Sequence, residues 1–384
     1  MPDPLPIRDD FPALASGRAY LDNAATTHQP RAVMRAVDAY IEHAHGTPEA
    51  GAVYADARAR VARHVGASLE NVVFCAGATQ AIQLVADGFH SNTPGDEIIV
   101  SSAEHIANLA PWQRWAAQRG GRLRAIDVDS SGALSLDAFR AALSARTRLV
   151  AITHVSNALG TTLPVRDMVK AAHEAGARVL IDGAQAVAHG PVAFADLGAD
   201  FYVFSGHKVF APTGIGVLLA TKELLEAMQP PLLGAQAYST FTLDDAEPAK
   251  APQRFEGGTS NVAGAVGLAA ALDYVAALGW PALDAHARRL LRRLDDGLAA
   301  IDGIRVLAGS APSVGVRSFV AGRDCIAIQR ALAEHGVDVR AGHLSAGTLL
   351  RQFGTAYAIR VSIAPYNNDD DIDRFISALR GAVR

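Results

Sequence analysis

Seven short apolar runs, each bounded by turn residues, recur along the first part of the chain, with helical patterns between several of them. Runs of this length are typical of buried β-strands, and their alternation with helices is typical of a mainly parallel sheet covered by helices. We therefore predict an α/β fold built on a seven-stranded, mainly parallel sheet. The runs are Asn71–Phe74, Glu97–Val100, Arg122–Ile126, Leu149–Ile152, Arg178–Ile181, Phe201–Phe204 and Ile215–Leu219.

The length of the chain predicts a second lobe. Its 384 residues exceed the size at which a single hydrophobic core usually stops growing. After Asn261 two segments with helical spacing, Ala263–Leu278 and Pro281–Ile301, replace the strand pattern, and the polar stretch Asp244–Pro252 just before them is expected to be a mobile loop. We expect a large domain over residues 20–270 and a smaller α/β domain made of residues 1–19 and 271–384.

Composition points to a small-molecule ligand. A formal net charge of −4 gives no electrostatic reason to expect a nucleic acid or an anionic membrane as partner. No apolar run approaches a membrane span in length, and Met1–Pro6 lacks the plan of a signal peptide. Cys75 and Cys325 have no CxxC spacing, and the histidines have no metal-ligand spacing. We therefore expect a cytoplasmic enzyme that has no metal site and acts on a small molecule.

Two polar segments directly follow apolar runs. Asp182 comes after the run Arg178–Ile181, and Ser205–Lys208 comes after Phe201–Phe204. Ligands in open α/β sheets collect outside the carboxyl ends of the strands, so Asp182 and Lys208 are expected to face one crevice. A carboxylate that holds a protonated pyridine nitrogen and a lysine that forms an imine are the two groups that pyridoxal phosphate requires. The pair therefore predicts this cofactor.

A phosphate site is predicted where a strand passes into a helix. The segment Phe74–Gln80 contains a glycine turn, so backbone N–H groups at the helix start and the Thr79 hydroxyl could hold a phosphate. Such turns are common and this signal alone is weak. Ser205 and His207 flank the lysine and could complete the site. The motifs of ATP and dinucleotide sites are absent from the sequence.

In these segments the chain resembles the class V aminotransferase family of pyridoxal phosphate enzymes, and within it the branch of cysteine desulfurases and selenocysteine lyases. The resemblance covers nearly the whole chain. Many ordered matches are hard to obtain by chance. They are Tyr20–Thr27, Glu104–Asn108, Pro111–Gln113, His154–Asn157, Asp182–Gln185, Ser205–Lys208, Phe255–Thr259 and Arg360–Ser362.

The resemblance implies a PLP-dependent transferase fold of type I, pyridoxal 5'-phosphate as cofactor, and a homodimer. Lys208 would bond covalently to the cofactor and act as the base, and Asp182 would pair with the pyridine nitrogen. Gln185 would contact the ring hydroxyl, and His105 would stack on the ring. The phosphate would be held by Ala78, Thr79, Ser205 and His207, with Thr259 arriving from the second subunit.

The resemblance also implies an α-amino acid substrate. Arg360 stands where the family binds the substrate carboxylate, and a guanidinium offers that group a bidentate fork. Asn157 could orient the same end of the substrate and contact the cofactor. Arg340 and His343 are further candidates for substrate binding.

One position departs from the desulfurase pattern. Desulfurases of this family carry a cysteine on the loop after an Arg-x-Gly-His segment, and its thiolate takes up sulfur as a persulfide. Here Ser345 stands at that position. Its hydroxyl has a far higher pKa than a thiol and forms no persulfide. Cys75 ends a predicted buried strand and Cys325 lies in a helical segment, so neither is expected to replace it. Ser345 is either a plain loop residue or a group that binds substrate or shuttles a proton.

The remaining chemistry needs no thiol. Proton removal at the substrate Cα allows a leaving group on Cβ to depart, so the first hypothesis is a β-lyase that cleaves a C–S or C–Se bond of a cysteine derivative. An amino-acid epimerase or racemase, or an aminotransferase, is the alternative on the same scaffold. A true cysteine desulfurase is disfavoured by Ser345. A silent homologue that only binds partners is disfavoured because it would need none of Lys208, Asp182, His105 and Arg360.

Overall fold

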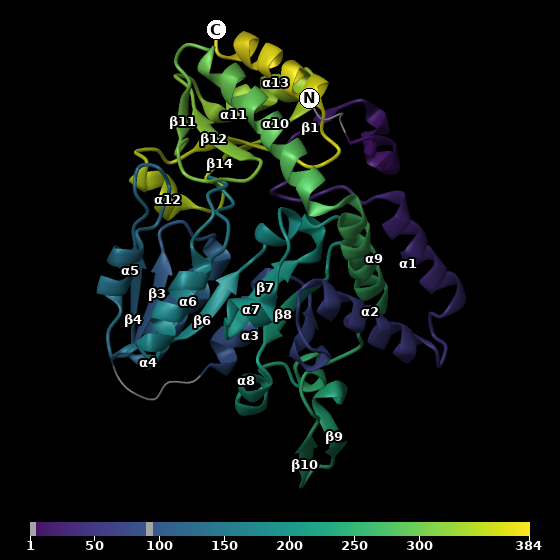
Figure 1. The fold of residues 1–384 in the computed structure, drawn as a ribbon. Coiled ribbons are helices and arrows are strands. Elements are labelled where there is room, and N and C mark those ends of the chain that lie inside the picture. Colours follow the sequence, from purple (N-terminus) through teal and green to yellow (C-terminus); the bar gives the residue numbers. More distant parts are fainter. Residues whose placement is uncertain (1–4, 90–94) are drawn as a thin grey trace.

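The computed structural model describes residues 5–89 and 95–384, with a large seven-stranded sheet at its centre (Figure 1). Its strand order is β2-β8-β7-β6-β5-β3-β4. Strand β8 runs antiparallel to β2 and β7, and the other neighbouring pairs are parallel. The predicted α/β fold with a mainly parallel sheet is confirmed. The strands are β2 (Val72–Cys75), β3 (Glu97–Ser101), β4 (Arg122–Ile126), β5 (Thr147–Thr153), β6 (Arg178–Asp182), β7 (Phe201–Ser205) and β8 (Gly216–Ala220).

Helices cover both faces of this sheet because its central strands are apolar on both sides. Successive side chains of a strand point to opposite faces, so Ile181 packs in one core with α2, α5, α6 and α9, and Leu180 packs in the other with α3, α4 and α8. The helices of this part are α1 (Arg31–His43), α2 (Ala50–His64), α3 (Ala78–Gly88), α4 (Ala110–Arg119), α5 (Leu136–Ala142), α6 (Val165–Glu174), α7 (Phe194–Leu197), α8 (Lys222–Ala227) and α9 (Val262–Leu278).

A smaller antiparallel sheet forms the second lobe, in the order β11-β12-β15-β14. Its core joins the sheet to α10, α11 and α13, and the periodic Ile372, Phe375, Ile376 and Leu379 of the last helix are all buried in it. Asn368 caps the start of this helix, where its side chain accepts from Asp371 N. The elements are α10 (Trp280–Ala299), β11 (Arg305–Leu307), β12 (Val316–Val320), α11 (Cys325–Glu334), β14 (Arg340–Gly342), α12 (Gly347–Gln352), β15 (Ala358–Ser362) and α13 (Asp369–Ala382).

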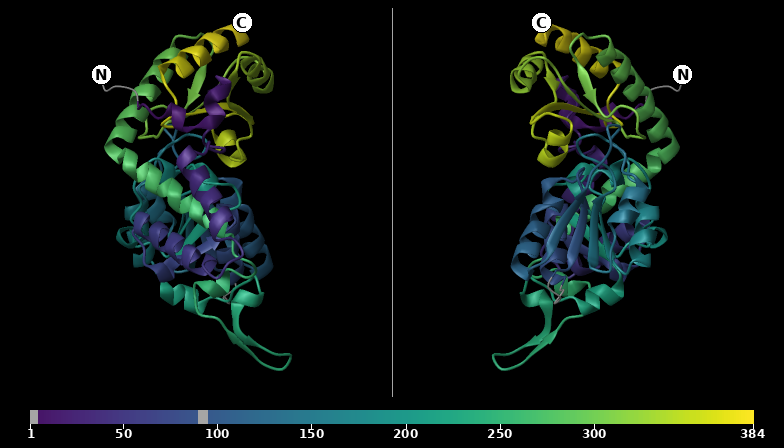
Figure 2. Two further views of the ribbon diagram at one scale, coloured as in Figure 1. Left: turned by 90° about the vertical axis from the view of Figure 1, so that its right-hand side faces the viewer. Right: turned by 90° about the vertical axis from the view of Figure 1, so that its left-hand side faces the viewer.

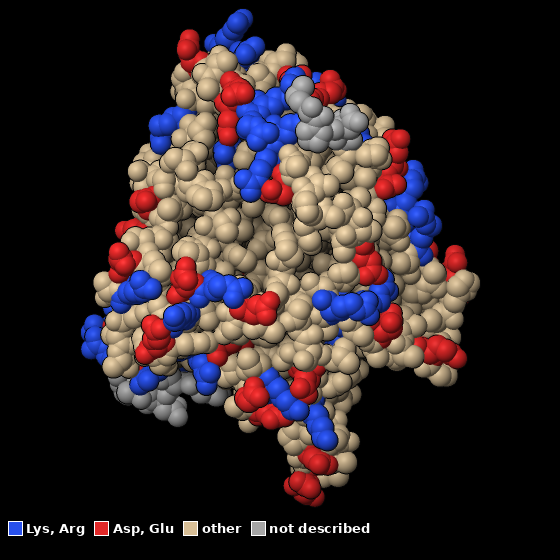
Figure 3. Space-filling view, viewed as in Figure 1, with Lys and Arg blue, Asp and Glu red and all other residues tan. Residues whose placement is uncertain are grey.

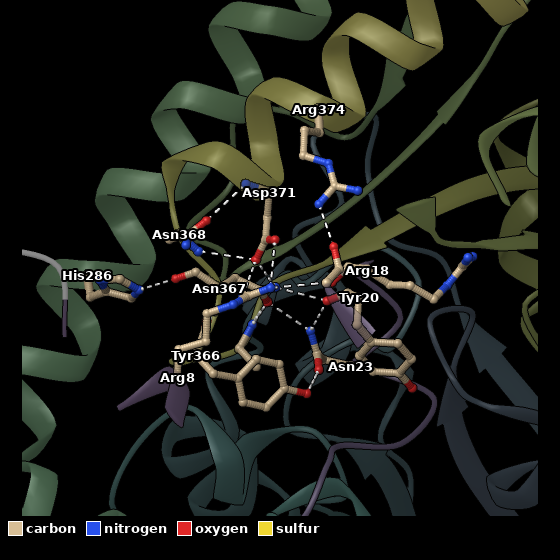
Figure 4. A network of polar contacts seen from close by, with 12 residues as sticks. Arg8, Arg18, Tyr20, Asn23, His286, Tyr366, Asn367, Asn368, Asp371 and Arg374 are labelled. Atoms are coloured by element: carbon tan, nitrogen blue, oxygen red, sulfur yellow. Dashed lines mark hydrogen bonds and ion pairs between the residues drawn. The ribbon is translucent and has the colours of Figure 1, made fainter. Parts of the chain in front are cut away.

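The described part of the N-terminal segment, residues 5–19, contacts both lobes: Phe11 packs in the core of the large lobe, and Arg8 and Arg18 reach the second lobe (Figure 4). The Arg8 guanidinium lies 2.7 Å from the buried Asp371 carboxylate at the start of α13, and Arg18 lies 2.6 Å from Asp338. Strand β1 (Ala19–Tyr20) pairs with β13 (Val337–Asp338). Residues 1–4 lie outside the described residues, and the exact domain boundaries stay a prediction.

The expected mobile loop at Asp244–Pro252 is wrong in part. Strands β9 (Tyr238–Phe241) and β10 (Ala246–Pro248) form an antiparallel hairpin that projects from the large lobe (Figures 1 and 2). Its turn is closed by hydrogen bonds from Thr242 N to Asp245 O and from Asp245 N to the Thr242 hydroxyl. The hairpin side chains are mostly exposed, so no hydrophobic alternation marks these strands in the sequence.

The two lobes are joined by α9 and α10, which meet at a bend of 79°. Gly279 lies at the bend with a φ of +81°, a conformation that glycine adopts without strain. Within the described residues no single helix has the length and hydropathy to cross a membrane, and α9 and α10 meet that criterion only when taken together across the bend.

Candidate active site

Polar residues from both lobes meet in one cavity of about 400 Å³ outside the carboxyl ends of β5, β6 and β7. The large lobe supplies the residues that follow its strands, and the second lobe supplies β14, the loop after it and β15. Twelve of the residues predicted from the sequence line this cavity: Ala78, Thr79, His105, Asn157, Asp182, Ser205, His207, Lys208, Arg340, His343, Ser345 and Arg360.

Gln185 and Thr259 do not line this cavity. Gln185 donates from Nε2 to Ala24 O at 2.8 Å and lines a small adjoining cavity together with Lys208. Thr259 lines a separate surface pocket beside Tyr54 and Glu256. Within a single chain Thr259 therefore lies apart from the site, and its role toward a second subunit stays a prediction.

Asp182 and Lys208 form the floor of the cavity. Asp182 accepts from Ala184 N through Oδ1 at 2.9 Å. Burial raises the pKa of this carboxyl, and the charge of Lys208 partly opposes the shift. Burial lowers the pKa of Lys208. The charge of Asp182 opposes this shift, and the charge of Arg360 lowers the pKa further. More of Lys208 is therefore present as the free amine at neutral pH than of a lysine on the surface.

Gly183, directly after Asp182, lies where the structure leaves no room for a side chain. A Cβ atom placed at this residue would lie 2.1 Å from the ring of Tyr202, which is fully buried and whose hydroxyl lies 3.0 Å from His154 Nδ1. We expect Gly183→Ala to lower the free energy of unfolding by about 3 kcal/mol, because neither the strand nor the ring has room to move. Urea denaturation measures this change.

Gly190→Ala is the matched control, because nothing lies within 4 Å of a Cβ atom at that position and its φ is unstrained. Equal stability of the two variants would contradict the account of Gly183.

His105 presents a neutral ring to the cavity. Its Nδ1 accepts from Ala107 N at 3.1 Å, which leaves the proton of the neutral ring on Nε2. Burial lowers its pKa to about 4, and the charge of Lys208 adds to the shift. The turn that carries it is fixed by the buried Glu104, which accepts from the Asn108 amide at 2.7 Å and from Thr153 N at 2.8 Å. Sequence reasoning assigned no role to Glu104.

The predicted phosphate end lies at the start of α3. Gly77 precedes the helix with a φ of +156°, and Ala78 N donates to the Ser205 hydroxyl at 2.8 Å, which joins the ends of two strands. Thr79 and His207 line the cavity here, and burial lowers the pKa of His207. N–H groups of a first helical turn and hydroxyl donors suit an anion.

The substrate end has two buried polar atoms without a hydrogen-bond partner among the described residues, Arg360 Nε and Asn157 Oδ1. Arg360 donates from Nη1 to Asn157 O at 3.1 Å and from Nη2 to Asp22 Oδ1 at 2.9 Å. Asp22 Oδ2 lies 2.7 Å from Arg340. Because an unpaired buried polar group is costly, the two orphan atoms fit a site that a polar ligand completes.

Asp22 is a residue whose role the sequence did not reveal. Its buried carboxylate bridges Arg340 and Arg360 and so holds both side chains in place. No local signal could have found this, because Arg360 is 338 residues away along the chain.

Ser345 faces the cavity from a tight turn. Leu344 and Ser345 have φ angles of +52° and +53°, so two successive side-chain-bearing residues adopt the left-handed conformation. The turn is held by hydrogen bonds from Ile106 N to Ser345 O at 2.8 Å and from the Asn157 amide to Leu344 O at 2.9 Å. The loop of Ser345 is thus tied to the segment of His105.

The two thiols lie elsewhere in the described structure. Cys75 lines the pocket of Thr259, and Cys325 begins α11 in the core of the second lobe. Burial raises the pKa of the Cys75 thiol to about 12 and also raises that of Cys325. Among residues 5–89 and 95–384, no three His, Cys, Asp or Glu side chains are grouped so that they could hold a metal ion.

The chain is similar in sequence and in structure to proteins of one family. The profile of the family "Aminotransferase class-V" matches residues 19–375. The chain is 40% identical to a probable cysteine desulfurase of Vibrio cholerae over 98% of both proteins. It is 41% identical to a probable cysteine desulfurase of Mycolicibacterium paratuberculosis over 97% of this chain, which corresponds to only 57% of that relative.

A solved structure has the same fold. The crystal structure of the cysteine desulfurase CsdA (S-sulfonic acid) from Escherichia coli superposes with a TM-score of 0.94 at 35% sequence identity, over 100% of this chain and 98% of that one. The likeness therefore includes both lobes.

Proposed function

Because the chain belongs to the aminotransferase class-V family, we propose that it is a pyridoxal 5'-phosphate enzyme that cleaves the C–S or C–Se bond of a cysteine derivative without passing sulfur to a thiol of its own. The observation that carries the proposal is Ser345. It lines the cavity with Lys208, whereas Cys75 and Cys325 lie elsewhere.

The residues of the cavity fit the cofactor. Pyridoxal phosphate, when bound, draws electrons from the substrate Cα and so makes loss of the Cα proton possible. Lys208 would hold it covalently, Asp182 would keep its ring nitrogen protonated, and the neutral His105 ring would lie against it. The anion end at the start of α3 would take the phosphate, and Asn157 would meet the ring hydroxyl together with Gln185, which would approach it from the adjoining small cavity. Thr259 would reach the same phosphate in a homodimer.

The side chains of the substrate end would orient an α-amino acid. Arg360 Nε is available as a charged donor for the carboxylate, while its two other nitrogens stay bonded to Asn157 O and Asp22. Asn157 Oδ1 would accept from a donor of the bound ligand. Lys208 would remove the Cα proton, since its lowered pKa leaves more of it unprotonated. Arg340 and His343 line the outer part of the cavity, where the side chain of the substrate would lie.

The bond from Cβ would break in one of two ways. A group such as the persulfide half of cystine would take the bonding electron pair, and the carbon skeleton would end as pyruvate and ammonia. The sulfinate group, released at the oxidation level of SO2, or elemental selenium would leave the pair on Cβ, which takes up a proton, and the skeleton would end as alanine. Without a thiol in the cavity, the leaving group departs as a small molecule rather than as a persulfide of the chain. Leaving groups that are stable when released, such as sulfinate, selenium or the persulfide half of cystine, suit this route. The names of the relatives favour cysteine or a close derivative as the substrate class.

The test is a product analysis with cysteine, cysteine sulfinate, selenocysteine, cystine and S-substituted cysteines. We expect release of pyruvate or alanine together with a small sulfur or selenium species, and no persulfide on the chain by mass spectrometry. Ser345→Cys is expected to gain a persulfide at the new thiol, and Ser345→Ala serves as the control for loss of the hydroxyl alone.

Other outcomes point to the alternatives. A persulfide on Cys75 or Cys325 of the native chain would make it a desulfurase. A product with the composition of the substrate but the inverted configuration at Cα would make the protein an epimerase or racemase. Release of a keto acid that retains the sulfur would make it an aminotransferase. Any of these would overturn the proposal.

A further inference from the structure

Lys208 has a second opening besides the active-site cavity. A small cavity of about 10 Å³ lies beside it and shares Ala24 and Lys208 with the active-site cavity. Its other walls include Gln185 and His189. A space of this size holds about one water molecule, and Lys208 and His189, which both line it, carry polar groups of the kind that can bind one.

The small cavity adjoins a larger one between the two lobes. This outer cavity has a volume of about 170 Å³ and shares His189 and Ala364 with the small cavity. Its walls include Thr162 from the large lobe, and Ser313 and the first turns of α10 from the second lobe. Figure 3 shows a hollow between the lobes, below α10. Lys208, the small cavity, His189 and the outer cavity thus form one series.

His189 is the one titratable residue among the five that line both cavities, and its imidazole makes no hydrogen bond to another described residue. Its backbone is fixed at the end of a short turn, where His189 N donates to Ala186 O at 2.9 Å. Burial lowers its pKa to about 4, so the ring is neutral at neutral pH. A neutral imidazole accepts a proton on one nitrogen and donates one from the other.

The charged groups near this series do not oppose passage of a proton. Asp284 and Arg288 of α10 line the outer cavity and neutralise each other at 2.8 Å. At the inner end, the charge of Asp182 raises the pKa of Lys208 and the charge of Arg360 lowers it.

We propose that His189 and the two cavities form a rear proton route between Lys208 and solvent. The Lys208 ammonium gives one proton to the intervening water as that water gives one to the near nitrogen of His189. The far nitrogen then releases its proton to water in the outer cavity. One proton leaves Lys208 and one reaches solvent, while the imidazole ends neutral in its other tautomer and resets by ring rotation. Such a route would let Lys208 exchange protons while cofactor and substrate fill the front cavity.

The inference rests on Lys208 being the base of the proposed function, but not on the identity of the leaving group. The probe is L-alanine, which has no leaving group on Cβ. With the holoenzyme in D2O, loss of its Cα proton signal in the NMR spectrum reports a proton taken by Lys208 and replaced by deuterium from solvent. A native enzyme that exchanges nothing while retaining its cofactor would refute the base role of Lys208 rather than the route.

Two independent variants test the route. His189→Gln removes the relay at similar size, and Ala364→Leu fills the inner space while leaving the imidazole. We expect each to slow deuterium incorporation roughly 10- to 100-fold with cofactor content and absorbance unchanged. Free imidazole is expected to restore exchange in His189→Ala. Leu291→Met, at the wall of the outer cavity, is the control and should behave as the native chain.

A second readout does not depend on activity. A high-resolution crystal structure of the holoenzyme is expected to show one water within hydrogen-bond distance of both Lys208 and His189, and Ala364→Leu should lack it. The proposal would be overturned if His189→Gln and Ala364→Leu both incorporated deuterium at the native rate. It would also be overturned if the native crystal lacked that water.

Discussion

Replacement of Lys208 by alanine is expected to abolish covalent attachment of pyridoxal phosphate and to lower turnover of any amino acid by roughly 1,000-fold or more. Lys208 lines both the active-site cavity and the small cavity behind it, and its lowered pKa makes it the one reactive amine at the carboxyl ends of the central strands in the described structure. The native chain, incubated with the cofactor and reduced with borohydride, should gain the mass of the cofactor on the peptide of Lys208. The variant should gain none.

Lys170→Ala is the matched control, because Lys170 is exposed on α6 and lines none of the cavities described here. This variant should keep both the absorbance of the bound cofactor and the turnover. Covalent cofactor on Lys208→Ala would mean that another lysine serves the site, and the proposed function would then lose its base.

The large sheet could be predicted because its signal is local. Its central strands are apolar on both faces, so each appears in the sequence as a short unbroken run, whereas the edge strand β4 is mostly exposed. All seven predicted runs correspond to strands. The hairpin β9–β10 could not, because its side chains are exposed and its pairing rests on backbone hydrogen bonds that leave no mark on residue choice.

The same distinction between local and long-range signals applies to the residues of the site. Asp182, Ser205 and Lys208 could be placed because each closely follows a strand and the ends of parallel strands meet. The roles of Asp22 and Glu104 could not, since each depends on partners brought together only by the fold. The resemblance to a family supplied Arg360 and Ser345, whose positions in the second lobe no pattern in the sequence linked to the sheet.

Asp182→Asn is expected to lower turnover roughly 100- to 1,000-fold while the chain stays folded. The carboxylate would stabilise a proton on the ring nitrogen of the cofactor, and a neutral amide of the same shape cannot supply that charge. The backbone contact survives, because the remaining carbonyl oxygen can still accept from Ala184 N. The pKa of the cofactor's ring nitrogen should therefore be lower in the variant than in the native chain. A pH titration of the cofactor absorbance measures this pKa independently of turnover.

Asp200→Asn separates this effect from a loss of stability. Asp200 is equally buried but lies before β7, at the opposite end of the sheet, where it accepts from Val179 N at 2.7 Å and pairs with Arg178 and His173. Its replacement breaks a charged network and should lower the free energy of unfolding by about 1–3 kcal/mol without moving the titration of the cofactor. If Asp182→Asn instead lowered stability and left the titration unchanged, Asp182 would be a cap of β6 and not the partner of the ring nitrogen.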